Sequence, residues 1–277
     1  MIPLRRSAFI AAAGAAALVR PRPARAAAGT GMVAKSPGPA VHARAGGRDV
    51  MLLIDTASAS STLAPATAAA LGLTGTSLAG VSLAGVTLRA HPMSIGDVGR
   101  WNALTGLTLD GVLGYEAFRD RVLTLDFHNR RVVFPDILPD GESAQITWLR
   151  YDANSPPLVT ISDVTVDGFP AGALIDTALG KNAVIFESKL PDLALDNEND
   201  KRLGPFAYAG EPLRPGRVGS VRLGTTTLMG SVRCYGADAR AHVPASEIAI
   251  ILGSGIFQNW ALTLDFPGSR AIVTAAG

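Results

Sequence analysis

The feature that most constrains this fold is an internal repeat of two motifs in the same order. The first motif is Ile-Asp-Thr-Ala, which occurs at residues 54–57 and again at residues 175–178. The second is Leu-Thr-Leu-Asp-Phe, which occurs at residues 123–127 and again, unchanged, at residues 262–266. Because repeated motifs mark repeated structural units, we expect two similar halves within the 277 residues.

Both halves are expected to be β-rich. Each Ile-Asp-Thr-Ala motif ends an extended run that follows a Gly turn, at Gly47 and at Gly168, and this pattern predicts a β-hairpin. The copies of the first motif lie 121 residues apart and those of the second 139 apart, so the second half contains an insertion, which we place near 203–219. Helical candidates are few: 64–72 as a short helix, and 115–120 and 254–260 as single turns.

Residues 1–26 have the three parts of a signal peptide. Arg5 and Arg6 precede an uncharged apolar run at 8–19, and the small-x-small sequence of residues 24–26 follows. The run is too short to cross a bilayer core of about 30 Å, so we expect cleavage and no stable membrane insertion. This predicts a periplasmic or secreted protein, with twin-arginine export and ordinary secretion both open.

Between the halves lies a polar stretch with flanking prolines, which reads as a linker. We therefore divide the mature chain into an N-terminal lobe at 27–138, a linker at 139–156 and a C-terminal lobe at 157–277. The formal charge of +2 gives no reason to expect a nucleic-acid partner. The single Cys and four scattered His residues lack the spacing of a metal site, so no metal and no cofactor are expected.

The chemistry is expected at Asp55 and Asp176. A lone carboxylate at the end of an apolar strand is costly to ionise, so the repetition of this feature suggests that the two residues meet. Two carboxyls about 3 Å apart share one proton. The ionised one can take a proton from a water that attacks a carbonyl carbon, and the protonated one can donate to the carbonyl oxygen.

At this point the sequence resembles the aspartic proteases. Residues 54–60, Ile-Asp-Thr-Ala-Ser-Ala-Ser, are similar to the Asp-Thr-Gly motif of that family, and residues 112–114 and 251–253 are similar to its hydrophobic-hydrophobic-Gly element. The resemblance covers nearly all of the mature chain and is closest to bacterial retropepsin-like proteins with both lobes on one chain. It implies an all-β, bilobal acid-protease fold whose two β-barrel-like lobes are related by a pseudo-twofold axis.

The resemblance also implies roles for individual residues. Asp55 and Asp176 would be the catalytic pair, and Ser58 would bind the outer oxygen of Asp55. Thr56 and Thr177 would form hydrogen bonds across the interface between the lobes.

Two functions stay open. One is an exported aspartic-type endopeptidase, a hydrolase that cuts polypeptide through a water activated between the two Asp residues. The other is an inactive pseudoprotease that binds extended peptides in the interlobe cleft. It is suggested by Ala57 and Ala178, where the family has Gly, and by Leu179, where the family has a hydroxyl residue. In both cases we expect a monomer with a polypeptide partner.

A lid is expected on one side only. The family's flap hairpin would lie between Leu73 and Val86, where this chain is short, whereas the insertion in the second copy is rich in turn residues. We therefore expect residues 206–217 to cover the Asp pair, with Tyr208 as a substrate contact.

Overall fold

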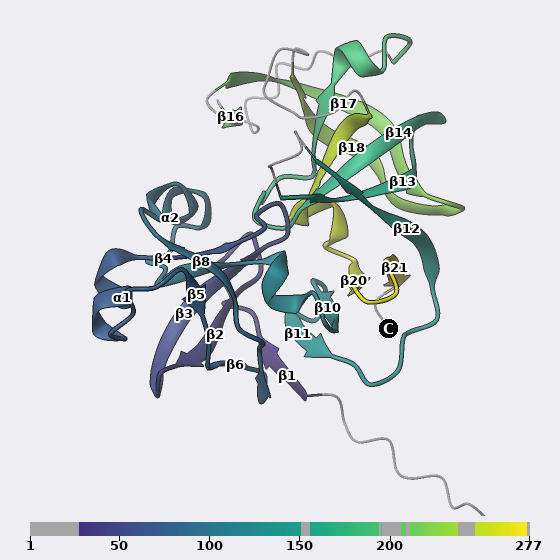
Figure 1. Cartoon of the computed structure of the whole chain (residues 1–277). Coiled ribbons are helices and arrows are strands. Elements are labelled where there is room, and N and C mark those ends of the chain that lie inside the picture. The colour runs from purple at the N-terminus through teal and green to yellow at the C-terminus, as the bar shows by residue number, and fades with distance from the viewer. Residues whose placement is uncertain are drawn as a thin grey trace, which may run out of the picture.

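The computed structural model describes residues 28–150, 156–193, 195, 206–208, 211–237 and 247–275. The expected signal peptide lies outside these residues. The described part of the chain is mostly β-strand, as predicted (Figure 1). None of its helices has the length and apolar character needed to span a membrane.

The first half of the chain, from residue 28 to residue 134, contains short strands, two short helices and a 3-10 turn. In chain order these are β1 (Ala28–Gly31), β2 (Ala40–Ala45), β3 (Arg48–Asp55), β4 (Ser61–Leu63), α1 (Pro65–Ala70), β5 (Ser77–Leu78), β6 (Val81–Leu83), β7 (Val86–Thr87), β8 (His91–Ile95), α2 (Gly99–Thr105), β9 (Gly111–Gly114), η1 (Tyr115–Phe118), β10 (Val122–Asp126) and β11 (Arg131–Phe134).

The second half, from residue 142 to residue 275, has longer strands. Its elements, in which η2 and η3 are 3-10 turns, are β12 (Glu142–Leu149), β13 (Leu158–Val166), β14 (Phe169–Asp176), β15 (Ala183–Phe186), η2 (Glu187–Lys189), β16 (Phe206–Tyr208), β17 (Glu211–Leu223), β18 (Thr226–Ala237), β19 (Ile248–Gly253), η3 (Ser254–Phe257), β20 (Trp260–Asp265) and β21 (Arg270–Ala275). The expected insertion corresponds to β16 and to the long β17, whose counterpart β6 is only three residues long.

The two halves have the same strand pairing. In the first half β2 and β3 form an antiparallel hairpin, β3 runs parallel to β9, and β9 runs antiparallel to β4. In the second half β13 and β14 form the hairpin, β14 runs parallel to β19, and β19 runs antiparallel to β15. Asp55 pairs with Gly114 in the first set, and Asp176 pairs with Gly253 in the second. The sequence repeat is therefore also a repeat of structure.

The two identical Leu-Thr-Leu-Asp-Phe segments join the halves. They form β10 and β20, which pair antiparallel with Thr124 opposite its own repeat equivalent, Thr263. The two hydroxyl oxygens lie 2.8 Å apart. A direct pair of equivalent residues is what a local two-fold axis between these strands requires.

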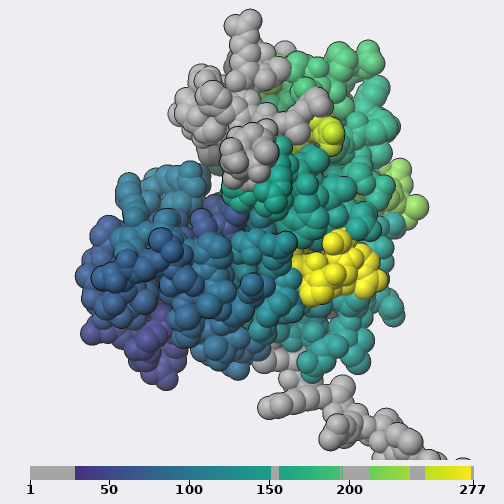
Figure 2. All heavy atoms as spheres, in the orientation of Figure 1, coloured from purple at the N-terminus to yellow at the C-terminus, as the bar shows by residue number. Residues whose placement is uncertain are grey.

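On either side of this pair the sheet continues in mirrored order. It runs β1-β11-β10-β20-β21-β12 within a 13-stranded sheet, while most of the first half forms a separate eight-stranded sheet. Figure 2 shows the yellow C-terminal residues among the teal atoms of the middle of the chain, which reflects the pairing of β21 with β12. The largest hydrophobic cluster extends through both halves by way of the inward-facing leucines of β10 and β20, Leu123, Leu125, Leu262 and Leu264.

The segment predicted as a linker, 139–156, differs from the prediction. It contains β12, which pairs first with β21 and then with β13. Within it, Ala144 and Ile146 are buried and the residues next to them are exposed, an alternation typical of a half-buried strand. The sequence prediction missed this alternation because the flanking prolines and polar residues are typical of a connecting loop. Residues 151–155 lie outside the described part of the chain.

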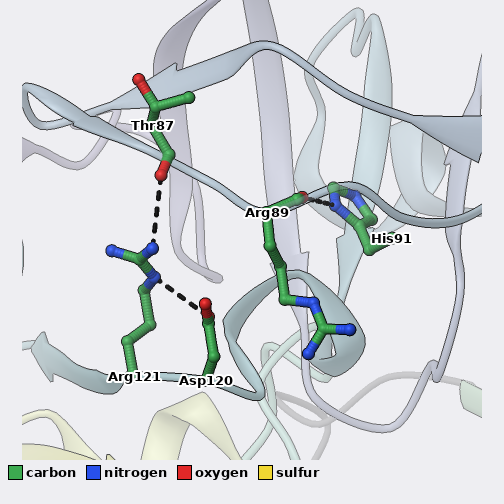
Figure 3. A network of polar contacts seen from close by, with 5 residues as sticks. All are labelled: Thr87, Arg89, His91, Asp120 and Arg121. Atoms are coloured by element: carbon green, nitrogen blue, oxygen red, sulfur yellow. Dashed lines mark hydrogen bonds and ion pairs between the residues drawn. The ribbon is translucent and has the colours of Figure 1, made fainter.

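His91, at the start of β8, is a buried titratable group of the first half. Its Nδ1 bonds the backbone carbonyl of Arg89 at 2.8 Å (Figure 3). Since a carbonyl only accepts, Nδ1 carries the proton and Nε2 is the bare nitrogen. Nε2 is buried and has no hydrogen-bond partner among the described residues. Desolvation by burial is the largest effect and lowers the pKa of His91 below 6.5. The hydrogen bond to the Arg89 carbonyl is the next largest effect and opposes this shift, the Arg89 cation lowers the pKa further, and Glu116 raises it by the smallest amount.

We predict that this histidine makes the fold less stable in acid. Because its pKa is lower in the folded state, the unfolded chain binds more protons below about pH 6.5, so the free energy of unfolding falls as the pH falls, by up to about 1.4 kcal/mol per pH unit. His91→Asn, which keeps an N–H donor for Arg89, should reduce this slope in urea titrations between pH 7 and pH 5. His128→Asn, at an exposed position, is the control, and equal slopes in all three proteins would contradict the prediction.

Candidate functional site

The candidate site lies where the strands β3 and β14 end. Asp55 is the last residue of β3 and Asp176 is the last residue of β14. Both side chains are buried, with 4% and 7% of their surface exposed. The three residues before each Asp are apolar and buried, so that the first polar side chain after each apolar run is a carboxylate.

Hydrogen bonds between the two following threonines join these strand ends. The Thr56 hydroxyl donates to the Ile175 carbonyl at 2.7 Å, and the Thr177 hydroxyl donates to the Ile54 carbonyl at 2.8 Å. Each hydroxyl oxygen also accepts the backbone N–H of the other threonine, at 3.2 Å in both directions. Both threonines are fully buried. This reciprocal set, the threonine lock, holds the backbone beside Asp55 directly against the backbone beside Asp176.

A second symmetric pair of contacts lies nearby. Tyr115, which follows β9, donates its hydroxyl to the carbonyl of Pro157 at 2.7 Å. Its counterpart Ser254, which follows β19, donates to the carbonyl of Pro37 at 2.8 Å. Each contact ties the turn after one half's central strand to the chain entering the other half's hairpin. Desolvation by burial raises the pKa of Tyr115 to about 12, so it remains a donor throughout the physiological range.

Asp55 accepts three hydrogen bonds. The N–H of Ala57 donates to Oδ1 at 2.9 Å, and the Ser58 hydroxyl donates to Oδ2 at 2.8 Å. The indole N–H of Trp101 donates to the same Oδ2 at 2.9 Å. The bond predicted for Ser58 is therefore present, and the bond from Trp101 was not foreseen. Donors of this kind stabilise the ionised form of a carboxyl group.

Asp176 has a different set of donors. Its Oδ1 accepts the backbone N–H groups of Ala178 at 3.1 Å and of Leu179 at 3.0 Å. Leu179 thus supplies a main-chain donor at the place where Ser58 supplies a hydroxyl in the first half. The threonine lock is symmetric, whereas the donors identified for Asp55 include two side chains and those identified for Asp176 are main-chain N–H groups.

The structure accommodates both alanines that replace the expected glycines. Ala178 is buried in a cluster with Leu53 and Trp101 of the first half, and Ala57 packs against a cluster of the second half that includes Leu179. Each methyl group therefore contributes apolar contact across the junction. The tight approach lies instead at Gly38, where an added Cβ would stand 3.0 Å from the Thr177 carbonyl oxygen.

Trp101 is the site residue that the sequence analysis missed. It lies on α2, in a stretch that belongs to neither repeated motif, and it reaches Asp55 across 46 residues of sequence. Neither its spacing nor its neighbours signalled a role. The only sequence signal was that a large aromatic residue occurs in a chain with few of them.

The expected lid is described in part. β16 pairs with the start of β17, with Tyr208 opposite Glu211, so that the segment begins as a hairpin. The Tyr208 side chain lies outside the described atoms. From Leu213 onward β17 belongs to the body of the second half, because Leu213 is buried in the same cluster as Leu179. Within residues 28–150 no hairpin corresponds to β16 and β17, because β5 pairs with β8 while β6 pairs with β2 and β7.

No three His, Cys, Asp or Glu side chains of the described segments lie close enough together to hold a metal ion.

The threonine lock should be a large contributor to stability. Thr56→Val removes one hydroxyl and leaves the Ile175 carbonyl and the Thr177 N–H buried without their partner, which should lower the free energy of unfolding by about 2–4 kcal/mol. Thr56→Ser keeps the hydroxyl and should recover most of this. Thr62→Val removes an exposed hydroxyl contact and should cost under about 1 kcal/mol. A loss for Thr56→Val no larger than that for Thr62→Val, in urea denaturation, would contradict the prediction.

Comparison with family models and with curated proteins assigns no family to this chain. No family model matches the chain, and no curated protein matches it.

Proposed function

We propose that this protein is an exported aspartic-type endopeptidase with a bilobal acid-protease fold. The observation that carries the proposal is the threonine lock, which joins two strand ends that each present a buried Asp. The equal strand pairing of the halves, with Asp55 beside Gly114 and Asp176 beside Gly253, supports it. The fold, the activity and the export are proposed together, because the two lobes, the Asp pair and the N-terminal leader occur in one chain.

In this proposal the two carboxyl groups share one proton and hold a water between them. Asp55 is the ionised member, because its two oxygens accept three donors, two of them side chains. It takes a proton from the water while the water oxygen attacks the peptide carbonyl carbon. Asp176 is the protonated member and gives its proton to the carbonyl oxygen. Collapse of the tetrahedral intermediate then breaks the C–N bond, and the amine leaves with a proton returned by the pair.

A second candidate is a peptide-binding protein without hydrolytic activity. Two observations favour it: the first half lacks a flap hairpin within residues 28–150, and Trp101 occupies a bonding position on Asp55. An extended peptide would then bind mainly through main-chain hydrogen bonds. The two candidates differ in one measurement, which is turnover of a bound peptide.

Hydrolysis should depend on both Asp residues and on acid pH. Asp55→Asn or Asp176→Asn removes the shared proton or its acceptor, so each should lower kcat by about 1000-fold or more. A statine-type inhibitor bound to the parent protein should reduce its activity to the same level. Asp126→Asn is the matched control, because Asp126 caps the turn at Asn129 away from the site, and it should keep parent activity. The assay is cleavage of an unfolded protein substrate between pH 3 and pH 7.

Unchanged cleavage after Asp55→Asn would exclude the proposed mechanism. Peptide binding that depends on the site, with no cleavage at any pH tested, would favour the peptide-binding candidate.

The β16–β17 hairpin should contribute to substrate binding. Replacing residues 206–211 by a short Gly-rich turn removes the hairpin but keeps Leu213 and the paired remainder of β17, so the fold should stay intact while kcat/KM, or peptide affinity, falls at least 10-fold. Tyr208→Ala should reproduce part of this loss. Phe169→Ala, at a partly exposed aromatic residue of another hairpin, is the control. Unaltered kinetics after removal of the hairpin would show that it is an ordinary surface loop.

A further inference from the structure

The hydrogen bond from Trp101 to Asp55 comes from a segment that lies outside both repeated motifs. The threonine lock and the contacts of Tyr115 and Ser254 all occur as symmetric pairs. The indole bond comes instead from α2, a helix within the first half, and it reaches the oxygen that already accepts the Ser58 hydroxyl. The indole therefore gives Asp55 a second side-chain donor, in addition to Ser58.

The indole ring is held firmly in this position. Trp101 is 6% exposed and packs in one hydrophobic cluster with Leu53 and Ala178. Its backbone carbonyl accepts the Thr105 hydroxyl at 2.8 Å, which stabilises the end of α2. The guanidinium of Arg100 lies over the ring, 3.7 Å from its centroid. A ring covered by a cation on one side and packed in a cluster is in a fixed orientation before any ligand arrives.

We propose that Trp101 is a positioning residue that keeps Asp55 in the role of ionised base. An indole N–H donates and cannot accept. It can therefore bond the carboxylate oxygen of Asp55 but cannot accept a proton carried on that oxygen. With Ser58 as a second donor on Oδ2, the shared proton of the pair is directed away from this oxygen and toward Asp176. This inference rests on the proposed function for its consequence in catalysis, but the hydrogen bond itself can be tested without turnover.

The first test follows the indole proton by NMR in the ¹⁵N-labelled mature protein. The chain has three Trp residues, so Trp101→Phe and Trp260→Phe assign the indole signals. The Trp101 signal should shift with pH as Asp55 ionises, and this response should vanish in Asp55→Asn. Trp260, whose indole donates to the Leu228 carbonyl, should give a signal that is unaffected by Asp55→Asn. A Trp101 signal that ignores Asp55→Asn would overturn the proposal.

The second test uses the pH dependence of cleavage. Trp101→Phe keeps most of the ring's packing but removes the donor, so the acidic limb of the kcat/KM profile should move to higher pH by about one unit. Trp260→Phe loses a comparable indole hydrogen bond outside the site and should leave the profile in place. A lower activity for Trp101→Phe with an unmoved profile would indicate a packing role and overturn the proposal.

The two tests separate the failure of this inference from that of the proposed function. If the chain cleaves no peptide but the Trp101 signal titrates with Asp55, the positioning role stands and the endopeptidase does not. If the chain cleaves peptide but neither the signal nor the profile responds, the endopeptidase stands and the positioning role does not.

Discussion

The rest of this structure depends on four hydrogen bonds made by Thr56 and Thr177, two between the threonines themselves and two from their hydroxyls to the carbonyls of Ile175 and Ile54. Both side chains are fully buried, so each bond replaces contact with water that is no longer accessible. The lock joins residues 121 positions apart, and it does so directly beside the two Asp residues. Because a hydroxyl both donates and accepts, one threonine from each half is enough to close the set. Any movement of one half relative to the other at this point would break bonds in both directions.

The same junction combines symmetry with asymmetry. The strand pairs, the threonine lock and the contacts to Pro37 and Pro157 follow the repeat. The donors around the two carboxylates do not, since Asp55 has a hydroxyl and an indole where the identified donors to Asp176 are main-chain N–H groups. Two equal carboxylates would share a proton evenly, whereas a base and an acid need different surroundings. The symmetric contacts therefore hold the two strand ends together, and in the proposed mechanism the donors on Asp55 would assign it the role of base.

The sequence was sufficient for those features that the repeat carries. The hairpins before Asp55 and Asp176 follow from motifs that occur twice. The meeting of the two threonines and the bond from Ser58 were implied by the family resemblance that these motifs carry. Trp101 could not be found in this way, because its bond depends on how α2 packs rather than on local sequence. The strand β12 was missed for another reason. Its apolar alternation is short and is surrounded by prolines and polar residues, which local rules assign to a connection.

The stability of the fold and the proposed catalytic activity are expected to change in opposite directions with pH. A shared proton between two carboxyls favours acid, because the pair stops working when that proton is lost. His91 favours neutral pH, because its imidazole is buried and Nε2 has no acceptor within the described part of the chain, so that protonation costs stability. His91 lies on β8, which pairs with β4 in the half that also carries Asp55. A fall in activity at low pH can therefore arise from destabilisation of this half of the fold rather than from a change in the protonation of the carboxyl pair. The two causes can be separated by varying the substrate concentration. A saturating ligand stabilises the folded state, so it restores activity lost through destabilisation of this half but not activity lost through the carboxyl pair.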